Sequence, residues 1–450
     1  MITPYQICIC ISLYVINYLQ QLHYDVAIIG GGILGCSIAY FLASFSNASV
    51  VVIEQENNFG MHASRRNTGK VHAPFLYDPA KRSLTAKAAL KGFDMLRKYC
   101  KVNSLPFKED GVMEVATSEG QIDTLHRYLE WGYKNGLTED QLKFLAKEEV
   151  AKVEPNVSCH SAIVCFRDAS TDYELITKQL ICDAQKFGCR VMPNSRFRNF
   201  AHNNHLIIRT EGTEKEIIAN YVINAGGGNS LNIAHGVGLA TEYRDLYFRG
   251  EYWQAPHEYS DLTHMSIYSV PKYSEYPFLN PHWIMRADGR REVGPNALPV
   301  FSPYSYEWTD NLKNSMAKIF QSSTSIGVMR LMMNSQFIRL ASKEFWSSIS
   351  KRAMVNRVRQ FLPSLKPSAF TTRGVAGIRS SLTDKEGNFV PEMLILENDY
   401  SLHILNYNSP GATGALPVGA KIVSGLLEKG CLHKSSEKGE SLWDISEILE

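Results

Sequence analysis

Three glycines near the start of the chain have the spacing of a turn that binds a dinucleotide: Gly30, Gly32 and Gly35. In such a turn the first glycine permits the tight bend, the second lets the backbone approach a pyrophosphate, and the third lets the next helix pack closely on the strand. Glu54 follows them by about 20 residues, where these sites bind a ribose hydroxyl. Together these residues predict a dinucleotide site.

A polar loop follows the strand that should end at Glu54. Its small, polar and basic side chains can donate hydrogen bonds to phosphate or to the carbonyl groups of a cofactor ring. The candidate donors are Ser64, Arg66, Asn67 and Thr68. His72, at the end of this loop, is the first histidine that can face a reaction cavity. The loop therefore extends the predicted site toward a reactive group.

The elements that must hold these residues follow an α/β pattern. The apolar runs Val26–Ile29 and Ser49–Ile53 predict buried parallel strands, and Leu34–Ser44 predicts a helix whose positive end points at the phosphates. Later segments return to the same sheet. They are a strand at Cys189–Pro193 that includes Val191, a strand at Tyr221–Gly227 that brings a second backbone approach at Gly226, a strand at Leu402–Leu405, a glycine-rich turn at Asn406–Gly419 and a helix at Ala420–Lys429.

This discontinuity separates two classes of dinucleotide enzyme. A nicotinamide enzyme normally keeps its strands and helices in one contiguous domain, whereas this chain leaves the fold after about two strands and returns to it much later. A flavin nucleotide is large and extended, and late segments of a chain must reach its ring. The pattern therefore favours FAD over NAD.

The other segments predict a second domain that is rich in sheet. Leu246–Pro303 alternates as strands do, and Thr371–Arg379 predicts a strand that ends in a basic residue. The basic helical pattern at Asn311–Leu362 favours a solvated helix face and leaves a membrane-surface role open. The predicted ranges are 23–100, 145–245 and 370–432 for the FAD-binding domain, 101–144 and 246–369 for the substrate domain, 1–22 for an N-terminal extension and 433–450 for a polar tail.

Composition limits the other functions. The chain has 450 residues, 44% of them hydrophobic and 20% charged, and a formal net charge of +2, so nothing favours a nucleic-acid partner. Its 9 cysteines are scattered and have no pair at metal-binding spacing. We therefore predict no metal site, and reduced thiols in a cytoplasmic compartment.

The N-terminal extension is apolar from about Ile7 to Leu19, which is shorter than the roughly 20 residues that span a bilayer. No lysine or arginine precedes Arg65, whereas secretory and transit signals begin with such residues. An extra helix or strand, or a wrongly chosen start codon, is favoured over an interfacial anchor. Peripheral membrane contact therefore stays open.

Motifs along most of the chain carry a family resemblance. They are Arg66-Asn67-Thr68-Gly69, Val71-His72-Ala73, Phe248-Arg249-Gly250-Glu251-Tyr252, Tyr268 with Val270-Pro271, Pro277-Phe278-Leu279 with His282, Asp288-Gly289, Val293-Gly294-Pro295-Asn296-Ala297, Gly377-Ile378-Arg379 and Ser409-Pro410-Gly411-Ala412-Thr413. With the opening glycines, they resemble the FAD-dependent D-amino-acid-oxidase-like superfamily, and within it the L-2-hydroxyglutarate dehydrogenases and oxidases. The resemblance covers about Tyr24 to Gly430.

The resemblance implies a Rossmann-like, discontinuous FAD-binding domain with a mixed or antiparallel-sheet substrate domain. It also implies oxidation of a small 2-hydroxy acid by hydride transfer to the flavin, with His72, or otherwise His282, as the base and Arg379 as the cation for the substrate carboxylate. Further substrate contacts are expected at Arg249, Tyr252 and Lys70, and more weakly at Arg286. Cofactor contacts are expected at Gly30, Gly32, Gly35, Glu54, Ser64, Arg66, Asn67, Thr68, Val191, Gly226, Gly411, Ala412 and Thr413.

Two departures from the family pattern lie beside the expected cavity. The usual Gly-Ala-Ser-Gly-Arg-Asn appears as His62-Ala63-Ser64-Arg65-Arg66-Asn67, and Pro74-Phe75-Leu76-Tyr77 replaces Gly-Ile-Tyr-Tyr. The substrate therefore stays open among a 2-hydroxy acid, glycerol 3-phosphate, malate and an amino acid, since Arg65 and Lys70 suit a phosphate or a second carboxylate. A flavoprotein subunit without turnover is also open. The electron acceptor can be a quinone, oxygen or a partner protein.

Overall fold

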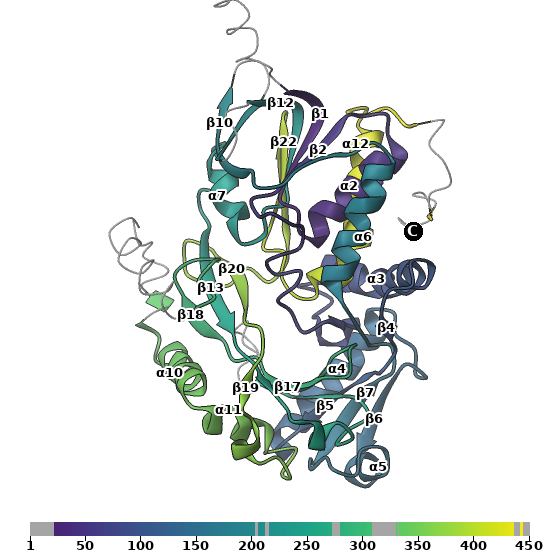
Figure 1. The fold of residues 1–450 in the computed structure, drawn as a ribbon. Helices are drawn as coiled ribbons and strands as arrows, with labels where there is room; N and C mark the ends of the chain where they lie inside the picture. Colours follow the sequence, from purple (N-terminus) through teal and green to yellow (C-terminus); the bar gives the residue numbers. More distant parts are fainter. Residues whose placement is uncertain are drawn as a thin grey trace, which may run out of the picture.

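The computed structural model describes residues 22–202, 206–211, 216–271, 280–307, 330–331, 333–435 and 442–443. Figure 1 shows two parts, an upper one around β1, β2 and β12 and a lower one around β5, β6 and β7. Most of the predicted extension and of the polar tail, the motif Pro277–Leu279 and part of Asn311–Leu362 lie outside the described residues.

The upper part is built on the sheet that the glycine turn requires. Its eight described strands run β10-β11-β12-β1-β2-β9, with β22 beside β12 and β21 beside β22. The pairings β1–β2, β1–β12, β2–β9 and β12–β22 are parallel. The bounds are β1 (Leu22–Ile29), β2 (Val50–Ile53), β9 (Arg190–Met192), β10 (Arg196–His202), β11 (Leu206–Glu211), β12 (Ile217–Asn224), β21 (Leu394–Asn398) and β22 (Ser401–Leu405). The predicted return of late strands to the first sheet is confirmed.

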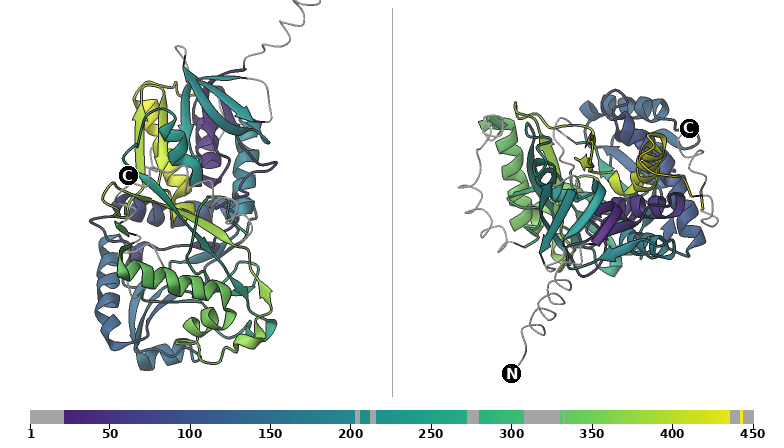
Figure 2. Two further views of the ribbon diagram at one scale, coloured as in Figure 1. Left: turned by 90° about the vertical axis from the view of Figure 1, so that its left-hand side faces the viewer. Right: turned by 90° about the horizontal axis from the view of Figure 1, so that it is seen from above.

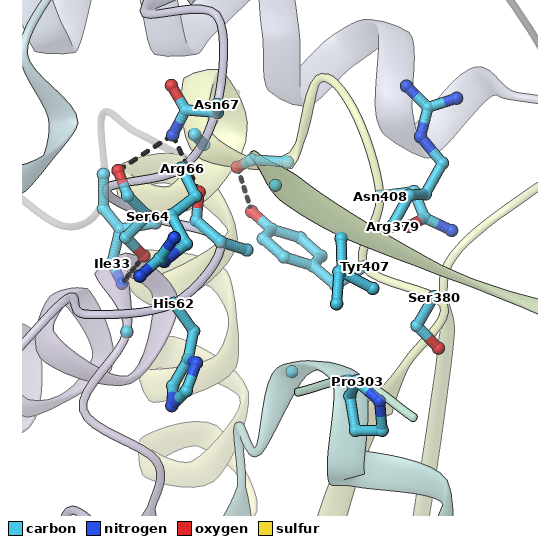
Figure 3. Close-up of a pocket in the computed structure, with 18 of the residues that line it drawn as sticks. Ile33, His62, Ser64, Arg66, Asn67, Pro303, Arg379, Ser380, Tyr407 and Asn408 are labelled. Atoms are coloured by element: carbon cyan, nitrogen blue, oxygen red, sulfur yellow. Dashed lines mark hydrogen bonds between the residues drawn. The ribbon is translucent and has the colours of Figure 1, made fainter. Parts of the chain in front are cut away.

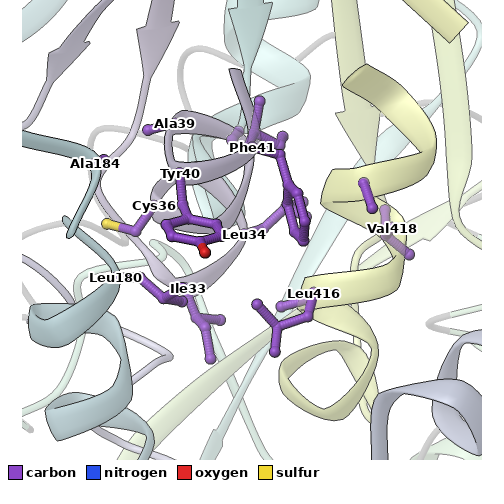
Figure 4. Close-up of a cluster of buried hydrophobic side chains, with 14 of the residues drawn as sticks. Ile33, Leu34, Cys36, Ala39, Tyr40, Phe41, Leu180, Ala184, Leu416 and Val418 are labelled. Atoms are coloured by element: carbon purple, nitrogen blue, oxygen red, sulfur yellow. The ribbon is translucent and has the colours of Figure 1, made fainter. Parts of the chain in front are cut away.

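Helix α2 (Ile33–Phe45) forms the centre of the upper core. It lies between α6 (Tyr173–Lys186) and α12 (Gly411–Glu428) (Figure 4), and α12 packs in turn on α3 (Ser83–Val102). Every residue of α2 from Ile33 to Ser44 is buried, which is typical of a helix covered on all sides. Because burying a large apolar side chain contributes about 1.5–3 kcal/mol, this packing fixes the start of α2 beside the glycine turn.

The lower part is built on a mixed sheet. Its eight described strands run β19-β14-β17-β16-β15-β5-β7-β6, and only the β5–β15 pairing within it is parallel. The bounds are β5 (Val112–Ala116), β6 (Leu142–Ala146), β7 (Ser161–Cys165), β14 (Trp253–Gln254), β15 (Ser266–Ser269), β16 (His282–Met285), β17 (Arg291–Gly294) and β19 (Thr372–Arg373). The fold class, α/β with a largely parallel first sheet and a mixed-sheet second domain, is as predicted.

Helices cover the lower sheet. They are α4 (Ile122–Lys134), α5 (Lys147–Val153) and α11 (Lys351–Val358). Helix α10 (Ser335–Ile349) packs on α11 and on the strand Leu298–Val300, and Figure 2 shows it along the outside of the molecule. A shorter helix, α7 (Ser230–His235), lies beside β22 in the upper part. In the described part of the chain, none of the helices combines the length and apolarity that a membrane span requires.

Two three-stranded sheets lie between these parts. One runs β18-β13-β20, from Leu298–Val300, Arg244–Gly250 and Gly377–Thr383. The other runs β3-β8-β4, from Lys70–Val71, Ala169–Thr171 and Phe107–Lys108. The predicted domain boundaries cut through the first of them, and β7 pairs in the lower sheet although its residues were assigned to the FAD-binding domain. The boundaries stay a prediction.

Two element predictions are wrong. Thr371–Arg379 is not one strand that ends in Arg379, because it forms β19 and the start of β20, with Arg379 paired opposite Phe248 of β13. Gly411–Gly419 is not a turn, because it is the first half of α12. The glycines there serve helix packing: a Cβ atom on Gly414 would lie 2.9 Å from the Cβ atom of Ala88 in α3.

The buried histidine of β22 makes folding sensitive to acid. His403 is fully buried, accepts a hydrogen bond from Asn224 at 2.9 Å, and has its pKa lowered to about 4 by burial. The unfolded chain therefore binds more protons than the folded chain between about pH 4 and 6.5. We expect stability to fall on acidification through this window, by about 1.4 kcal/mol per pH unit from this group.

Thermal unfolding of the protein and of His403→Gln, measured from pH 4 to 7, tests this expectation. The variant is destabilised at pH 7 by the lost packing, but its melting temperature should depend less on pH. A slope as steep as that of the unchanged protein would contradict the assignment to His403.

Candidate active site

A cavity of about 350 Å³ joins the glycine turn to the start of α12. Figure 3 shows its two walls: Ile33, Ser64, Arg66 and Asn67 lie on one side, and Arg379, Ser380 and Asn408 on the other. The first wall comes from the N-terminal segment and the second from β20 and the loop before α12. The cavity therefore forms only when distant parts of the chain meet.

The glycine turn has the predicted shape. Gly30 has φ +108°, and a Cβ atom there would lie 2.5 Å from the carbonyl oxygen of Ala225. A Cβ atom on Gly35 would overlap the carbonyl oxygen of Gly30, so α2 can pack this closely only through a glycine. Gly32 begins α2 without a side-chain cap, and the Ile33 N–H donates to Ser64 Oγ at 2.9 Å. The open end of α2 thus faces the cavity.

Glu54 lies at the end of β2, with 6% of its surface exposed. Its Oε2 atom accepts from the Gly31 N–H at 2.7 Å, and its Oε1 atom accepts from the Glu56 N–H at 2.9 Å. Burial raises the pKa of its carboxyl, and these backbone donors oppose that shift. The carboxylate lines the cavity, and its oxygens have lone pairs left for a ribose hydroxyl.

The polar loop after β2 is held by its own side chains. Asn67 donates to the carbonyl oxygens of Ala63 and Ser64 at 2.9 and 2.8 Å. Arg66 donates to Ala376 O at 3.2 Å, and its guanidinium lies 4.1 Å from the ring centre of Tyr306. Asn67 and Arg66 therefore shape the cavity wall through protein contacts.

His72 lines the cavity beside a buried charge cluster. Its Nδ1 atom lies 3.6 Å from Oδ2 of Asp168, which is fully buried. Lys70 Nζ lies 3.2 Å from the other oxygen of Asp168 and 2.8 Å from Asp110. Burial would raise the pKa of Asp168, but Lys70 and His72 hold it below its usual value. Asp168 is therefore an ionised carboxylate directly behind His72.

Three further predicted residues line the same cavity: Arg379, Tyr252 and His282. Burial lowers the pKa of the Arg379 guanidinium, but a guanidinium titrates so far above neutral pH that it keeps its charge. Burial raises the pKa of Tyr252 to about 12. His282 is 3% exposed, and burial lowers its pKa to about 3, so its ring is neutral at physiological pH.

The first turn of α12 closes the cavity near His72. Gly411, Ala412 and Thr413 all line it, and Thr413 Oγ1 accepts from the backbone N–H of His72 at 3.1 Å. The first N–H groups of a helix have no acceptor within the helix and carry partial positive charge. The cavity thus lies between the N-terminal ends of two helices, α2 and α12, which suits an anionic or electron-rich ligand.

Five residues that were predicted as cofactor or substrate contacts make other contacts in the structure. Gly35 and Val191 do not line the cavity; Gly35 packs on Gly30, and Val191 pairs within the sheet. Arg249 points away, with its guanidinium 3.0 Å from Glu251. Lys70 lines the cavity, but its ammonium is fully buried between carboxylates. Arg286 is likewise paired with Glu292. We therefore do not keep Arg249, Lys70 and Arg286 as substrate ligands.

Several lining residues escaped the sequence analysis. They are Phe197, Tyr268, Tyr304, Tyr306 and Tyr407, and Asp168 supports His72 from behind the cavity wall. Aromatic residues in strands usually belong to the hydrophobic core, so the local sequence did not identify these residues as lining a cavity. Tyr268 lay inside a motif that we quoted, and its position in that motif was the one available signal.

The arrangement fits a flavin dinucleotide. Comparison with known families gives a match to the family described as "FAD dependent oxidoreductase" (DAO) over residues 25–424. The chain belongs to this family of FAD-dependent oxidoreductases. Its cofactor is FAD, and its substrate is a small molecule. Among the described residues, no group of histidine, cysteine and acidic side chains is placed to hold a metal ion.

Relatives and solved structures agree with this assignment. The chain is 30% identical over 404 residues to an L-2-hydroxyglutarate dehydrogenase of Escherichia coli, covering 89% of this chain and 92% of that one. It is 28% identical to the mitochondrial L-2-hydroxyglutarate dehydrogenase of Homo sapiens, covering 89% and 88%. The L-alpha-glycerophosphate oxidase of Mycoplasma pneumoniae shares the fold of this DAO-family chain, with a TM-score of 0.72 at 20% identity, covering 92% and 97%.

Gly30→Ala should abolish flavin binding, because its Cβ atom would meet the Ala225 carbonyl oxygen. Gly188→Ala is the matched control: Gly188 has φ +94° but nothing within 4 Å of an added Cβ atom, so it bears only the backbone strain, about 1 kcal/mol. The measurement is flavin released per protein on denaturation. A full flavin content in Gly30→Ala would contradict the cofactor position.

Proposed function

We propose that this enzyme oxidises a small 2-hydroxy acid related to L-2-hydroxyglutarate. The observation that carries the proposal is the convergence of a guanidinium, Arg379, and a carboxylate-backed imidazole, His72, on the cavity that holds the cofactor turn. A 2-hydroxy acid needs both groups: a cation for its carboxylate and a base for its hydroxyl proton. The relatives named as L-2-hydroxyglutarate dehydrogenases support the same substrate class.

FAD, when bound, supplies the two-electron oxidant that accepts a hydride from the carbon bearing the hydroxyl. The chain's own residues bind the acid, orient it and take up the hydroxyl proton. Arg379 fixes the carboxylate through its planar pair of N–H donors, which sets the position of the neighbouring carbon. Arg379 is held in the middle of β20, paired with β13, so its backbone cannot shift easily.

His72 is the better base of the two histidines. Its Nδ1 atom faces the ionised Asp168, so the proton is taken up at Nε2 and the imidazolium that forms is stabilised by the carboxylate. His282 has a pKa near 3 and is too weak a base near neutral pH. Lys70 supports His72 indirectly, because its ammonium keeps Asp168 ionised.

A phosphate substrate is less well supported. The two cations that suited it in the sequence were Arg65 and Lys70. Arg65 does not line the cavity and pairs with Glu174 at 3.0 Å, and Lys70 is fully buried between Asp110 and Asp168. Neither residue offers a free cation to a phosphate. The contacts in the cavity therefore favour a carboxylic-acid substrate over a phosphate substrate.

Anaerobic mixing of the flavin-loaded protein with a panel of acids tests the function. We expect L-2-hydroxyglutarate to bleach the flavin, and glycerol 3-phosphate and amino acids to leave it oxidised. Bleaching by an amino acid or by glycerol 3-phosphate alone would overturn the substrate class. If nothing in the panel bleaches the flavin, the alternative of a subunit without turnover is favoured. Adding oxygen or a soluble quinone to the bleached protein then identifies the acceptor.

Replacing the substrate cation should separate binding from cofactor loading. Arg379→Met should lower kcat/KM for the hydroxy acid by about 100-fold or more, since a bidentate charged contact is lost. Flavin content should not change. Arg290→Met is the control, because Arg290 lies in an exposed turn and pairs only with Asp288. Equal kinetics in both variants would remove Arg379 from the proposed role.

His72→Asn should slow flavin reduction by about 10²–10⁴-fold, which is the usual contribution of a positioned base. Asp168→Asn removes the negative charge that stabilises the imidazolium of His72, so flavin reduction should also slow, by less than in His72→Asn. Stopped-flow reduction measures both effects. If Asp168→Asn reduces its flavin at the unchanged rate, Asp168 does not act through the base.

A further inference from the structure

Two stacked rings in the cavity wall carry polar atoms that no group in the described part of the chain satisfies. Tyr268 of β15 and His282 of β16 both line the cavity, and each is 3% exposed. Their ring centres are 3.9 Å apart, with planes inclined by 25°. Neither the Tyr268 hydroxyl nor His282 Nδ1 has a hydrogen-bond partner. Both positions are set by the neighbouring strands, since β15 pairs with β5 and with β16.

Leaving such atoms unpaired is costly. A buried polar group without a partner destabilises the folded state by about 1–3 kcal/mol, and native proteins contain few of them. Here two such groups lie on adjacent strands, in the wall of the cavity that also holds Arg379 and His72. They can form hydrogen bonds with a polar group of the bound substrate. A purely apolar substrate tail would leave both of them unsatisfied.

Charges of both signs surround this pair. Burial raises the pKa of Tyr268, and the carboxylates of Asp168, Glu114 and Asp110 raise it further. Lys70 pairs with two of these carboxylates, Asp110 and Asp168.

After burial, the groups that lower the pKa of His282 are His72, Arg379 and Arg357. Arg357 reaches toward the pair from α11: it bonds Glu344 at 2.8 Å and donates to Asn280 Oδ1 at 3.2 Å. Burial keeps the imidazole of His282 neutral, and the cations on its side of the pair attract a carboxylate. The neutral imidazole and the phenol can each donate one hydrogen bond to it.

We propose that Tyr268 and His282 bind the second carboxylate of a dicarboxylic 2-hydroxy acid, while Arg379 binds the carboxylate next to the reacting carbon. This inference rests on the proposed function and deepens it, because it makes the enzyme selective for diacids. The hydroxyl of Tyr268 and the imidazole N–H of His282 donate to the distal carboxylate. A monoacid of the same length keeps the contact to Arg379 and loses these two.

The test compares two five-carbon substrates, 2-hydroxyglutarate with two carboxylates and 2-hydroxyvalerate with one. Tyr268→Phe keeps the ring and removes only the hydroxyl, and His282→Asn removes the imidazole. We expect each variant to lower kcat/KM for 2-hydroxyglutarate by about ten-fold or more, as loss of a hydrogen bond to a charged group does. The value for 2-hydroxyvalerate should change little. Equal losses on both substrates, or no loss on either, would overturn the proposal.

A binding measurement separates this subsite from the reaction. Glutarate and pentanoate cannot be oxidised at a hydroxyl, and their binding is followed by the perturbation of flavin absorbance. Tyr268→Phe should weaken glutarate binding and leave pentanoate binding unchanged. If the unchanged protein oxidises no hydroxy acid but still shows this difference, the proposed function fails and the subsite stands. If glutarate and pentanoate bind alike in every variant, the subsite is wrong whatever the enzyme oxidises.

The stability of Tyr268→Phe gives an independent readout. Because the hydroxyl has no partner among the residues that the structure describes, its removal should leave the melting temperature unchanged or raise it. Flavin content should also be unchanged. A marked loss of stability would mean that the hydroxyl already has a structural partner, which contradicts the inference.

Discussion

The parallel pairing of β1 with β2 on one side and β12 on the other is the constraint on which the site depends. It brings the Gly30 N–H to the carbonyl oxygen of Ile53 at 2.9 Å and sets Ala225 against Gly30 so closely that no side chain fits there. The cavity opens at the carboxyl ends of these strands, where open α/β sheets bind their ligands. The cofactor site and the sheet therefore form together, and bound FAD should stabilise the fold.

A buried ion pair fixes the position of His72 in the reaction site. Lys70 and Asp168 sit on or beside the short sheet β3-β8-β4 between the two main sheets, and their contact holds His72 against the start of α12. Breaking one partner of a buried ion pair typically destabilises a protein by about 3–5 kcal/mol. The cluster thus gives the imidazole a fixed position and a fixed electrostatic surrounding, which a surface histidine lacks. Arg379 gains the same rigidity from the β13–β20 pairing.

The elements that short sequence patterns determine could be predicted from the sequence. The spacing of Gly30, Gly32 and Gly35 and the apolar runs around them gave the turn, the first strands and the return of late segments. The start of α12 could not be predicted, because glycine disfavours helix in isolation and its use there depends on the contact with α3. Arg249 was overrated because the side chains of β13 alternate: Phe248 and Gly250 line the cavity, and Arg249 does not. The partners of Asp168 depend on strands that meet only in the folded chain.

The position of the flavin tests the account most directly. It is measured by an experimental structure of the purified protein with FAD and glutarate. The account predicts the pyrophosphate at the first turn of α2, the flavin ring beside the first turn of α12, and the diacid between Arg379 and His72. A flavin ring bound away from Arg379, or a glycine turn closed by side chains with no dinucleotide beside it, would contradict it.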